Sequence, residues 1–396
     1  MKQALFPEVV WFQEGPGVRN TQYTDSGVKL LNVANLVDGR VDLSNTDRYI
    51  SEEEAYGKYK HFLVDDGDFI IASSGIKVEY FDKKMGFVSE AQLPLCMNTS
   101  TIRFKVLDKN ILDIRYFMYF LKTDQFKQQL SREITGSAQL NFGPSHLKKM
   151  HLPLIDLTEQ HKIAAVLDKV SDLIAKRQQQ LDKLDEAVKA RYVEIFGEPD
   201  ENPKHWQEDE LSHHLKVIGG YAFKSDGFTD GGIPVLRIGN INSGHFLPVN
   251  MVYWPDDLAL ARYKVFPGDL VMSLTGTVGK DDYGNVCILG ADYDEYYLNQ
   301  RNARLSIEKS LDKCYFSELL KFPRIKKRLT GISRGIRQAN ISNKDILTLR
   351  VPIPPIELQE QFAAFVEQTE KTKIIISHSL EKLETLKKAL MQEYFG

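Results

Sequence analysis

The end of this chain repeats its middle without a gap. Sliding the sequence by 199 positions places residues 152–197 on residues 351–396, and both copies end in the same Phe-Gly pair. Identical residues at matched positions include Pro153 with Pro352, Gln160 with Gln359, Leu181 with Leu380 and Glu194 with Glu393. A repeat of this length constrains the fold strongly, because each copy must form the same structural unit.

The repeat continues upstream with an offset that changes in steps. Matched positions lie 205, then 201, then 199 apart, as in the pairs Thr24 with Thr229, Gly67 with Gly268 and Tyr116 with Tyr315. Such changes indicate loops of different length between shared strands and helices. We therefore expect two copies of one unit, each a variable domain followed by a helical segment. The predicted boundaries are 1–151 and 198–350 for the variable domains, and 152–197 and 351–396 for the helical segments.

Composition narrows the class of protein. A chain of 396 residues with 42% hydrophobic content is too long for one ordinary core, so two domains are expected. The sequence has no apolar run of about 18 residues and no signal-peptide pattern at its start, which favours a cytosolic protein without a membrane segment. Its three isolated cysteines, Cys96, Cys287 and Cys314, argue against a disulfide framework or a cysteine zinc site. We expect them to be buried, and we expect no metal and no cofactor.

The helical segments have a seven-residue rhythm. Asp156 followed by Glu159 predicts a capping box, and residues 157–195 contain neither Gly nor Pro. The apolar seam residues are Leu167, Ile174, Leu181, Leu184 and Val188 in the first segment, and Val366, Ile376, Leu380, Leu383 and Leu390 in the second. A helix over residues 157–195 would be about 58 Å long. We expect an antiparallel two-stranded coiled coil linking the two domains with pseudo-two-fold symmetry. The alternative is two independent helices, each folded onto its own domain.

The variable domains mix short strands with turns, which favours an α+β fold. The predicted strands are 28–36, 68–75 and 101–107 in the first copy, and 233–241, 269–276 and 302–307 in the second. One helix follows in each copy, at 115–130 and at 314–329. The fold class expected is therefore two pseudo-symmetric α+β domains joined by a long antiparallel two-helix coiled coil.

Basic residues gather around these two helices. Residues 315–350 contain nine Lys or Arg against two acidic residues, and residues 111–150 contain six against three. A basic footprint in both copies is expected if each copy binds a polyanion such as double-stranded DNA, although the net charge of the chain is −3. The alternative is a solvated helix face.

A Gly-x-x-Gln-x-Asn loop follows the helix in each copy. Side-chain amides can read adenine, and arginines can bind guanine or phosphate. The loops provide Gln139 and Asn141 in the first copy, and Arg334, Arg337, Gln338 and Asn340 in the second. Alternatively, these amides only cap turns.

Further DNA-binding candidates lie at polar strand ends and near the start of each copy. The strand-end candidates are Ser73, Ser74 and Lys77 in the first copy, and Thr275, Thr277 and Lys280 in the second. The candidates near the starts are Arg19, Asn20 and Gln22, and Phe223, Lys224 and Ser225. Backbone amides and lysines in such loops favour phosphate.

Sequence signatures of catalysis are missing. The chain has no motif for amino methylation, no phosphate-binding loop of the Walker type and no His-Glu-x-x-His pair. We therefore expect no catalytic residues and no enzymatic activity in this chain.

Together these features resemble the specificity (S) subunit of type I restriction-modification systems over essentially the whole chain. The most specific segments are LPLIDLTEQHKIAAVLD at 152–168 and VPIPPIELQEQFAAFVE at 351–367. Segments 11–36, 223–244 and 266–280 look like the family's target recognition domains. The resemblance implies a non-catalytic subunit whose two domains each bind half of a split DNA site, with the coiled coil fixing the gap. It also implies two methyltransferase subunits and, in the restriction complex, two motor-nuclease subunits.

Geometry and divergence add two expectations. Two readers at the ends of a rigid rod would meet neighbouring major-groove segments about 34 Å apart. Because the variable domains share few residues outside turns and core strands, the two half-sites should differ in sequence. The alternatives are a component of a methylation-only or type IIB-like system, a chain that itself carries catalysis, and a scaffold that binds no DNA.

Overall fold

The computed structural model describes residues 2–45, 47–134, 140–241, 244–278, 280, 282–331 and 338–396. The chain divides into two compact units. Unit 1 comprises Met1–Lys176 and Ser379–Gly396, and unit 2 comprises Arg177–His378. Each unit therefore combines one variable domain with the start of its own long helix and the end of the other long helix.

Unit 1 is built on a four-stranded antiparallel sheet in the order β2 (Val10–Glu14), β11 (Thr101–Val106), β7 (Phe69–Ala72) and β9 (Met85–Phe87). Phe104 in the centre lies opposite Phe12 and Phe69 on the flanking strands. All three of these phenylalanines lie in or against the main core of the unit, so apolar burial holds this sheet in place. The strand predicted at 101–107 is confirmed. The run predicted as one strand at 68–75 divides into β7 and β8 (Ser74–Ile76), which belong to different sheets.

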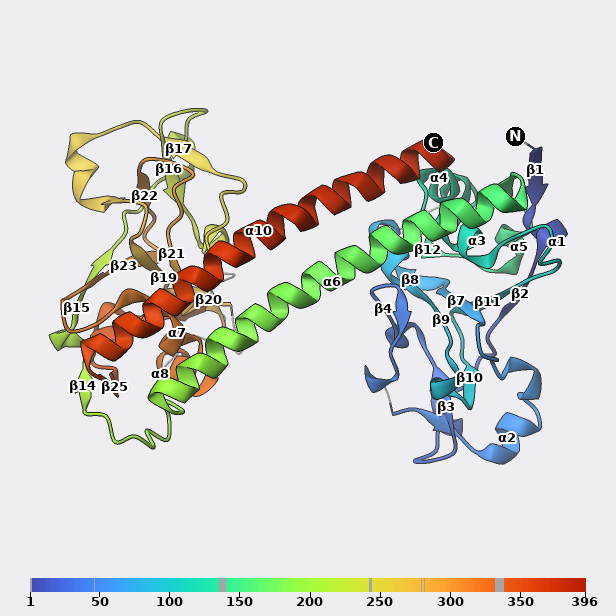
Figure 1. The fold of residues 1–396 in the computed structure, drawn as a ribbon, viewed down its shortest axis with the longest axis horizontal. Coiled ribbons are helices and arrows are strands. Elements are labelled where there is room, and N and C mark those ends of the chain that lie inside the picture. Colours follow the sequence, from blue (N-terminus) through green and yellow to red (C-terminus); the bar gives the residue numbers. More distant parts are fainter. Residues whose placement is uncertain are drawn as a thin grey trace. The chain divides into compact units, whose positions relative to one another are not determined.

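Smaller ladders complete unit 1 (Figure 1). Strand β3 (Val28–Leu31) pairs in parallel with β10 (Leu95–Met97) and antiparallel with β6 (Tyr49–Ile50). The two-stranded ladders are β1 (Lys2–Leu5) with β13 (His151–Leu154), β4 (Leu36–Val37) with β5 (Arg40–Val41), and β8 (Ser74–Ile76) with β12 (Leu140–Asn141). The short helices are α1 (Phe6–Val9), α2 (Glu52–Tyr56) and α5 (Pro144–Leu147).

Unit 2 repeats this design. Its central sheet has the order β15 (Leu215–Gly219), β23 (Asn302–Ile307), β19 (Leu270–Ser273) and β21 (Val286–Ile288). A second sheet has the order β17 (Val252–Trp254), β16 (Ile233–Leu236), β22 (Tyr296–Leu298) and β18 (Lys264–Val265). The remaining elements are the ladders β14 (Glu208–Glu210) with β25 (Arg350–Pro352) and β20 (Thr275–Thr277) with β24 (Gln338–Asn340), and helix α9 (Asn343–Leu347).

Strands β3 and β16 are shorter than the sequence predicted, and the reason is a repeated asparagine. The side-chain oxygen of Asn35 accepts the N–H of Asn32 at 2.9 Å, and that of Asn240 accepts the N–H of Arg237 at 2.9 Å. These bonds close a 3-10 turn directly after each strand, because an asparagine amide can replace a ladder partner. The predictions at 28–36 and 233–241 were therefore right in type and too long.

The prediction of one helix at 115–130 and one at 314–329 was wrong. The structure has α3 (Ile114–Leu121) and α4 (Asp124–Glu133) in unit 1, and α7 (Lys313–Lys321) and α8 (Pro323–Thr330) in unit 2. In unit 1 the hydroxyl of Thr123 accepts the N–H of Phe126 at 3.2 Å and starts a new helix. In unit 2 Pro323 occupies the first turn of α8, where its missing N–H costs nothing.

The two long helices are α6 (Leu157–Phe196) and α10 (Ile356–Phe395), each 40 residues long. Within unit 1 the end of α10 packs with the start of α6 in one core, and within unit 2 the end of α6 packs against the start of α10 (Figure 1). The helices are therefore antiparallel in both units. The alternative, in which each helix folds only onto its own domain, does not occur, and the predicted fold class is confirmed.

The predicted seam residues lie on the packed side of these helices. Leu167, Val188 and Val366 are buried, and the others are partly buried: Ile174, Leu181, Leu184, Ile376, Leu380, Leu383 and Leu390. The heptad pattern therefore predicted the packed face. None of the helices described in either unit has a stretch long and apolar enough to span a lipid bilayer.

Candidate nucleic-acid interface

A short ladder brings the polar candidates of each unit together. In unit 1 the strand-end residue Ser74 pairs with Asn141 of the Gly-x-x-Gln-x-Asn loop, and the Ser74 hydroxyl donates to the Asn141 side-chain oxygen. In unit 2 Thr275 and Asn340 are partners in the matching backbone ladder. Residues far apart in sequence thus form one polar edge, at corresponding places in both copies.

The candidates of unit 1 differ in exposure. Ser73 is only 1% exposed, and its hydroxyl has no hydrogen-bond partner among the described residues. This burial argues against Ser73 as a direct DNA contact, because its side chain faces the interior at the end of a fully buried strand. Lys77 and Asn141 are exposed, and Gln139 lies outside the described residues.

The candidates of unit 2 follow the same pattern. Thr275 is buried, whereas Thr277, Lys280 and Asn340 are exposed. The backbone N–H of Thr277 donates to Asp282 at 2.7 Å and its hydroxyl donates at 2.8 Å, and these bonds lower the pKa of the Asp282 carboxyl. This polar edge therefore carries a carboxylate that stays ionised. Arg334 and Arg337 lie outside the described residues, and Gln338 pairs with Thr277 through its backbone.

Near the start of the first copy, Gln22 already has partners within the unit. Arg19 and Asn20 are exposed beside it. The Gln22 side chain accepts the N–H of Arg19 at 3.1 Å and donates to Glu54 at 2.7 Å. It also donates to the hydroxyl of Tyr59 at 3.1 Å. This amide therefore holds the loop, and Arg19 and Asn20 present the polar surface.

Near the start of the second copy, Phe223 is a packing residue. It is only 8% exposed and lies edge-on to Trp254 and beside Tyr297, with ring centroids 5.1 and 5.5 Å away. The sequence singled out Phe223 together with its polar neighbours, but aromatic burial places it in a small core. Lys224 and Ser225 are exposed.

Part of the predicted basic footprint is neutralised within the units. In unit 1, Arg115 pairs with Asp168 at 2.8 Å, Lys127 with Asp82 at 2.7 Å and Lys149 with Glu133 at 2.6 Å. Burial, with Lys387 nearby, lowers the pKa of Lys122 to about 8. In unit 2, Lys326 is buried and donates to Asn285, and Arg328 pairs with Asp200. Exposed basic residues of the footprint outside these ion pairs include Arg132 and Lys148 in unit 1, and Arg324, Lys327, Lys344 and Arg350 in unit 2.

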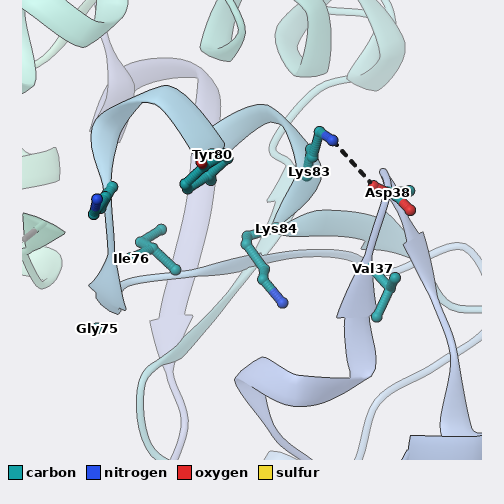
Figure 2. A pocket seen from close by; sticks show the side chains of 8 residues that line it. Val37, Asp38, Gly75, Ile76, Tyr80, Lys83 and Lys84 are labelled. Carbon is teal, nitrogen blue, oxygen red and sulfur yellow. Dashed lines mark ion pairs between the residues drawn. The ribbon is translucent and has the colours of Figure 1, made fainter. Parts of the chain in front are cut away.

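Sequence reasoning missed a pocket next to the polar edge of unit 1. It has a volume of about 420 Å³ and is lined by Val37, Asp38, Gly75, Ile76, Lys77, Tyr80, Lys83 and Lys84 (Figure 2). Of these residues the sequence singled out Lys77. The adjacent pair Lys83-Lys84 just before strand β9 was the available signal, but nothing in the sequence joined it to the turn around Asp38.

The described residues contain no group of three or more His, Cys, Asp or Glu placed to hold a metal ion. Cys96 and Cys287 are buried, and burial raises the pKa of each thiol to about 12. Cys314 is only partly buried, so its predicted full burial is corrected; burial raises its pKa to about 11. At neutral pH these thiols stay protonated and are poor nucleophiles.

Known proteins resemble this arrangement in sequence and in fold. The sequence matches the type I restriction modification DNA specificity domain twice, over residues 23–186 and 203–385. The type I restriction enzyme MjaVIII specificity subunit of Methanocaldococcus jannaschii is 25% identical over 353 residues, covering 84% of this chain and 79% of that protein. The EcoKI specificity subunit of Escherichia coli (strain K12) is 22% identical over 204 residues, covering 48% of this chain and 42% of that protein. The crystal structure of the S subunit of the M. genitalium type I restriction-modification system covers 100% of this chain and 96% of its own, with a TM-score of 0.59 at 15% identity.

Proposed function

Because this chain belongs to the family of type I restriction modification DNA specificity domains, we propose that it is the non-catalytic subunit that recognises DNA in a type I restriction-modification complex. Each unit binds one half of a bipartite, asymmetric site in double-stranded DNA. The paired long helices set the unread gap between the half-sites. Methyl transfer and cleavage are carried out by partner subunits, and this chain needs no cofactor of its own.

One observation carries this proposal: the framework is repeated, and so is the edge asparagine at Asn141 and Asn340, while other side chains at and beside the polar edge differ. The central sheets have the same strand order in both units. At the ladders, however, Ser74 corresponds to Thr275 and Lys77 to Val278 at an offset of 201. A shared framework with different exposed side chains is what two readers of different half-sites require.

The long helices support the proposed docking of two methyltransferase subunits. Ile374 and Ile375 on α10 are 67% and 72% exposed, and Leu173 on α6 is 39% exposed. Such apolar side chains on a solvent-facing helix favour a protein partner. A repeated framework can offer each of two identical partners an equivalent platform. In the restriction complex we expect two motor-nuclease subunits as well.

Mapping methylated bases across the genome of a host with and without this chain tests the proposal directly. We expect methylation at a bipartite site with two different half-sites to depend on the chain. A palindromic site would contradict the assignment of different half-sites to the two units. Unchanged methylation, together with no binding of duplex DNA in a filter assay, would overturn DNA recognition and favour a scaffold.

Two variants of the proposal have separate tests. In a methylation-only or type IIB-like system, the same methylated site would occur without a motor-nuclease partner. If the chain itself carried catalysis, the purified protein alone would transfer methyl groups or cleave DNA. We expect neither activity from the purified chain.

A further inference from the structure

The pocket of unit 1 lies between two segments that are separate in sequence. Ile76 and Tyr80 lie on one side, Val37 and Asp38 on the other, and Lys84 projects between them (Figure 2). The backbone N–H of Gly39 donates to the carbonyl of Lys83 at 3.1 Å and ties the two segments together. The pocket is therefore a feature of the folded unit.

A rigid short helix presents the lysines. This 3-10 helix, Val78–Lys83, carries Phe81, which is fully buried and packs against Phe126 and Phe142 with ring centroids 5.8 and 6.1 Å away. With Phe81 fixed in the core, the neighbouring Tyr80 stays 51% exposed. The orientation of this helix is thus set before any ligand binds.

The charge of the pocket is positive. Three lysines, Lys77, Lys83 and Lys84, line it together with one carboxylate, Asp38. Lys83 and Asp38 form an exposed ion pair at 3.7 Å, with side chains 62% and 67% exposed. A single weak pair leaves an excess of positive charge facing an open cavity, and such a cavity attracts anions.

The lysines are specific to the first copy. At an offset of 201, positions 77, 80, 83 and 84 correspond to Val278, Asp281, Gly284 and Asn285. By contrast, residues that build the framework are kept in both copies, as in the pairs Gln160 with Gln359 and Tyr116 with Tyr315. The unit can therefore be built without these lysines, which points to a role that only the first copy has.

We propose that this pocket binds a backbone phosphate of the DNA duplex. Lys77 and Lys84 supply the positive charge, and the exposed ring of Tyr80 packs against the adjoining sugar. The pocket gives the first unit a phosphate contact that the second unit lacks, and it orients the neighbouring Ser74 and Asn141 edge toward the bases. This inference rests on the proposed recognition of DNA by each unit.

The test compares the salt dependence of DNA binding for the full chain and two double variants. The pocket variant is Lys77→Gln with Lys84→Gln, and the control is Lys58→Gln with Lys109→Gln, two exposed lysines outside the pocket lining. The probe is a duplex carrying the mapped site. Each lost phosphate contact should reduce the slope of log affinity against log salt by about 0.9, so we expect a reduction of about 1 to 2 in the pocket variant and a smaller one in the control.

A second variant is expected to strengthen binding, which a misfolded protein would not do. Asp38→Asn removes the carboxylate that pairs with Lys83, so it should tighten binding several-fold at low salt and steepen the slope. Both variants should keep the parent's preference for the mapped site over a scrambled duplex. If both variants kept the parent's slope of log affinity against log salt, phosphate binding in the pocket would be ruled out. If the parent chain bound no duplex at all, the proposed function itself would be overturned.

Discussion

At the scale of single residues, one buried glutamine joins each long helix to its domain. Gln160 and Gln359 are fully buried. The side-chain oxygen of Gln160 accepts the N–H of Asp113 at 2.9 Å, and its amide donates to the carbonyls of Ile111 and Ile155. Gln359 makes the same three bonds, to Asp312, Ser310 and Pro354. The repeat identified this pair, and the structure explains it as a satisfied polar junction.

Gln160→Ala should therefore destabilise unit 1 by about 2 to 3 kcal/mol, because it leaves buried backbone groups without partners. Urea unfolding followed by circular dichroism measures this loss. The matched control is Gln178→Ala on the same helix. Its amide donates to Asp182 at an exposed position, so the substitution should cost less than about 0.5 kcal/mol. Equal costs for the two substitutions would contradict the role assigned to Gln160.

At the scale of elements, an aromatic residue anchors the end of each long helix. Phe395 at the end of α10 packs in unit 1 against Tyr116 and Phe120, with ring centroids 5.1 and 6.4 Å away. Phe196 at the end of α6 packs in unit 2 against Tyr315 and Phe362 at 4.7 and 5.6 Å. Each anchor packs against the variable domain of the other copy. The phenylalanine of the repeated Phe-Gly ending is thus a conserved packing contact of both copies. The glycine after Phe196 has φ +80°, a conformation that ends helices.

Phe395→Ala should release the end of α10 from unit 1, since removing a buried phenylalanine costs about 3 to 5 kcal/mol. Limited proteolysis and amide hydrogen exchange over residues 379–396 measure the release. Leu386→Ala is the matched control, because Leu386 lies on the same helix segment and is 46% exposed. Equal protection of residues 379–396 in the Phe395 variant and in the control would contradict the role of Phe395 as an anchor.

At the scale of the whole molecule, the repeat consists of a gap-free helical part and two divergent variable domains. The helices repeat without insertions, while the variable domains differ in loop length and in polar side chains. If the paired helices set the gap, their length and the recognised bases are separate properties of the chain.

Inserting one heptad at matching positions in α6 and α10 tests this separation. Seven helical residues add about 10.5 Å while keeping the apolar seam in register. We expect the gap in the methylated site to grow by about one to three base pairs, at 3.4 Å per base pair, with both half-sites unchanged. Methylation mapping of the variant reads out both properties, and altered half-site bases would contradict the ruler model.

The sequence alone predicted much of the candidate site, but not which of its members face solvent. Ser74, Asn141, Thr275 and Asn340 were all singled out, and they meet in pairs on corresponding ladders. Ser73 and Phe223 were grouped with them and are buried. Burial depends on neighbours distant in sequence, such as Trp254 beside Phe223, and a local pattern does not contain them.

The duplication, the central strands and the seam of the long helices could be predicted from the order of residues alone, because periodicity and repetition are properties of the chain read in order. Three features could be seen only in the folded chain: where the shorter helices break, which basic residues are neutralised, and how the Lys83-Lys84 pair meets the turn at Asp38. Those outcomes depend on ion pairs, caps and packing between segments that folding brings together. The lysine pocket of unit 1 is the clearest case, since the two segments that line it are at least 37 positions apart in the sequence, from Asp38 to Gly75.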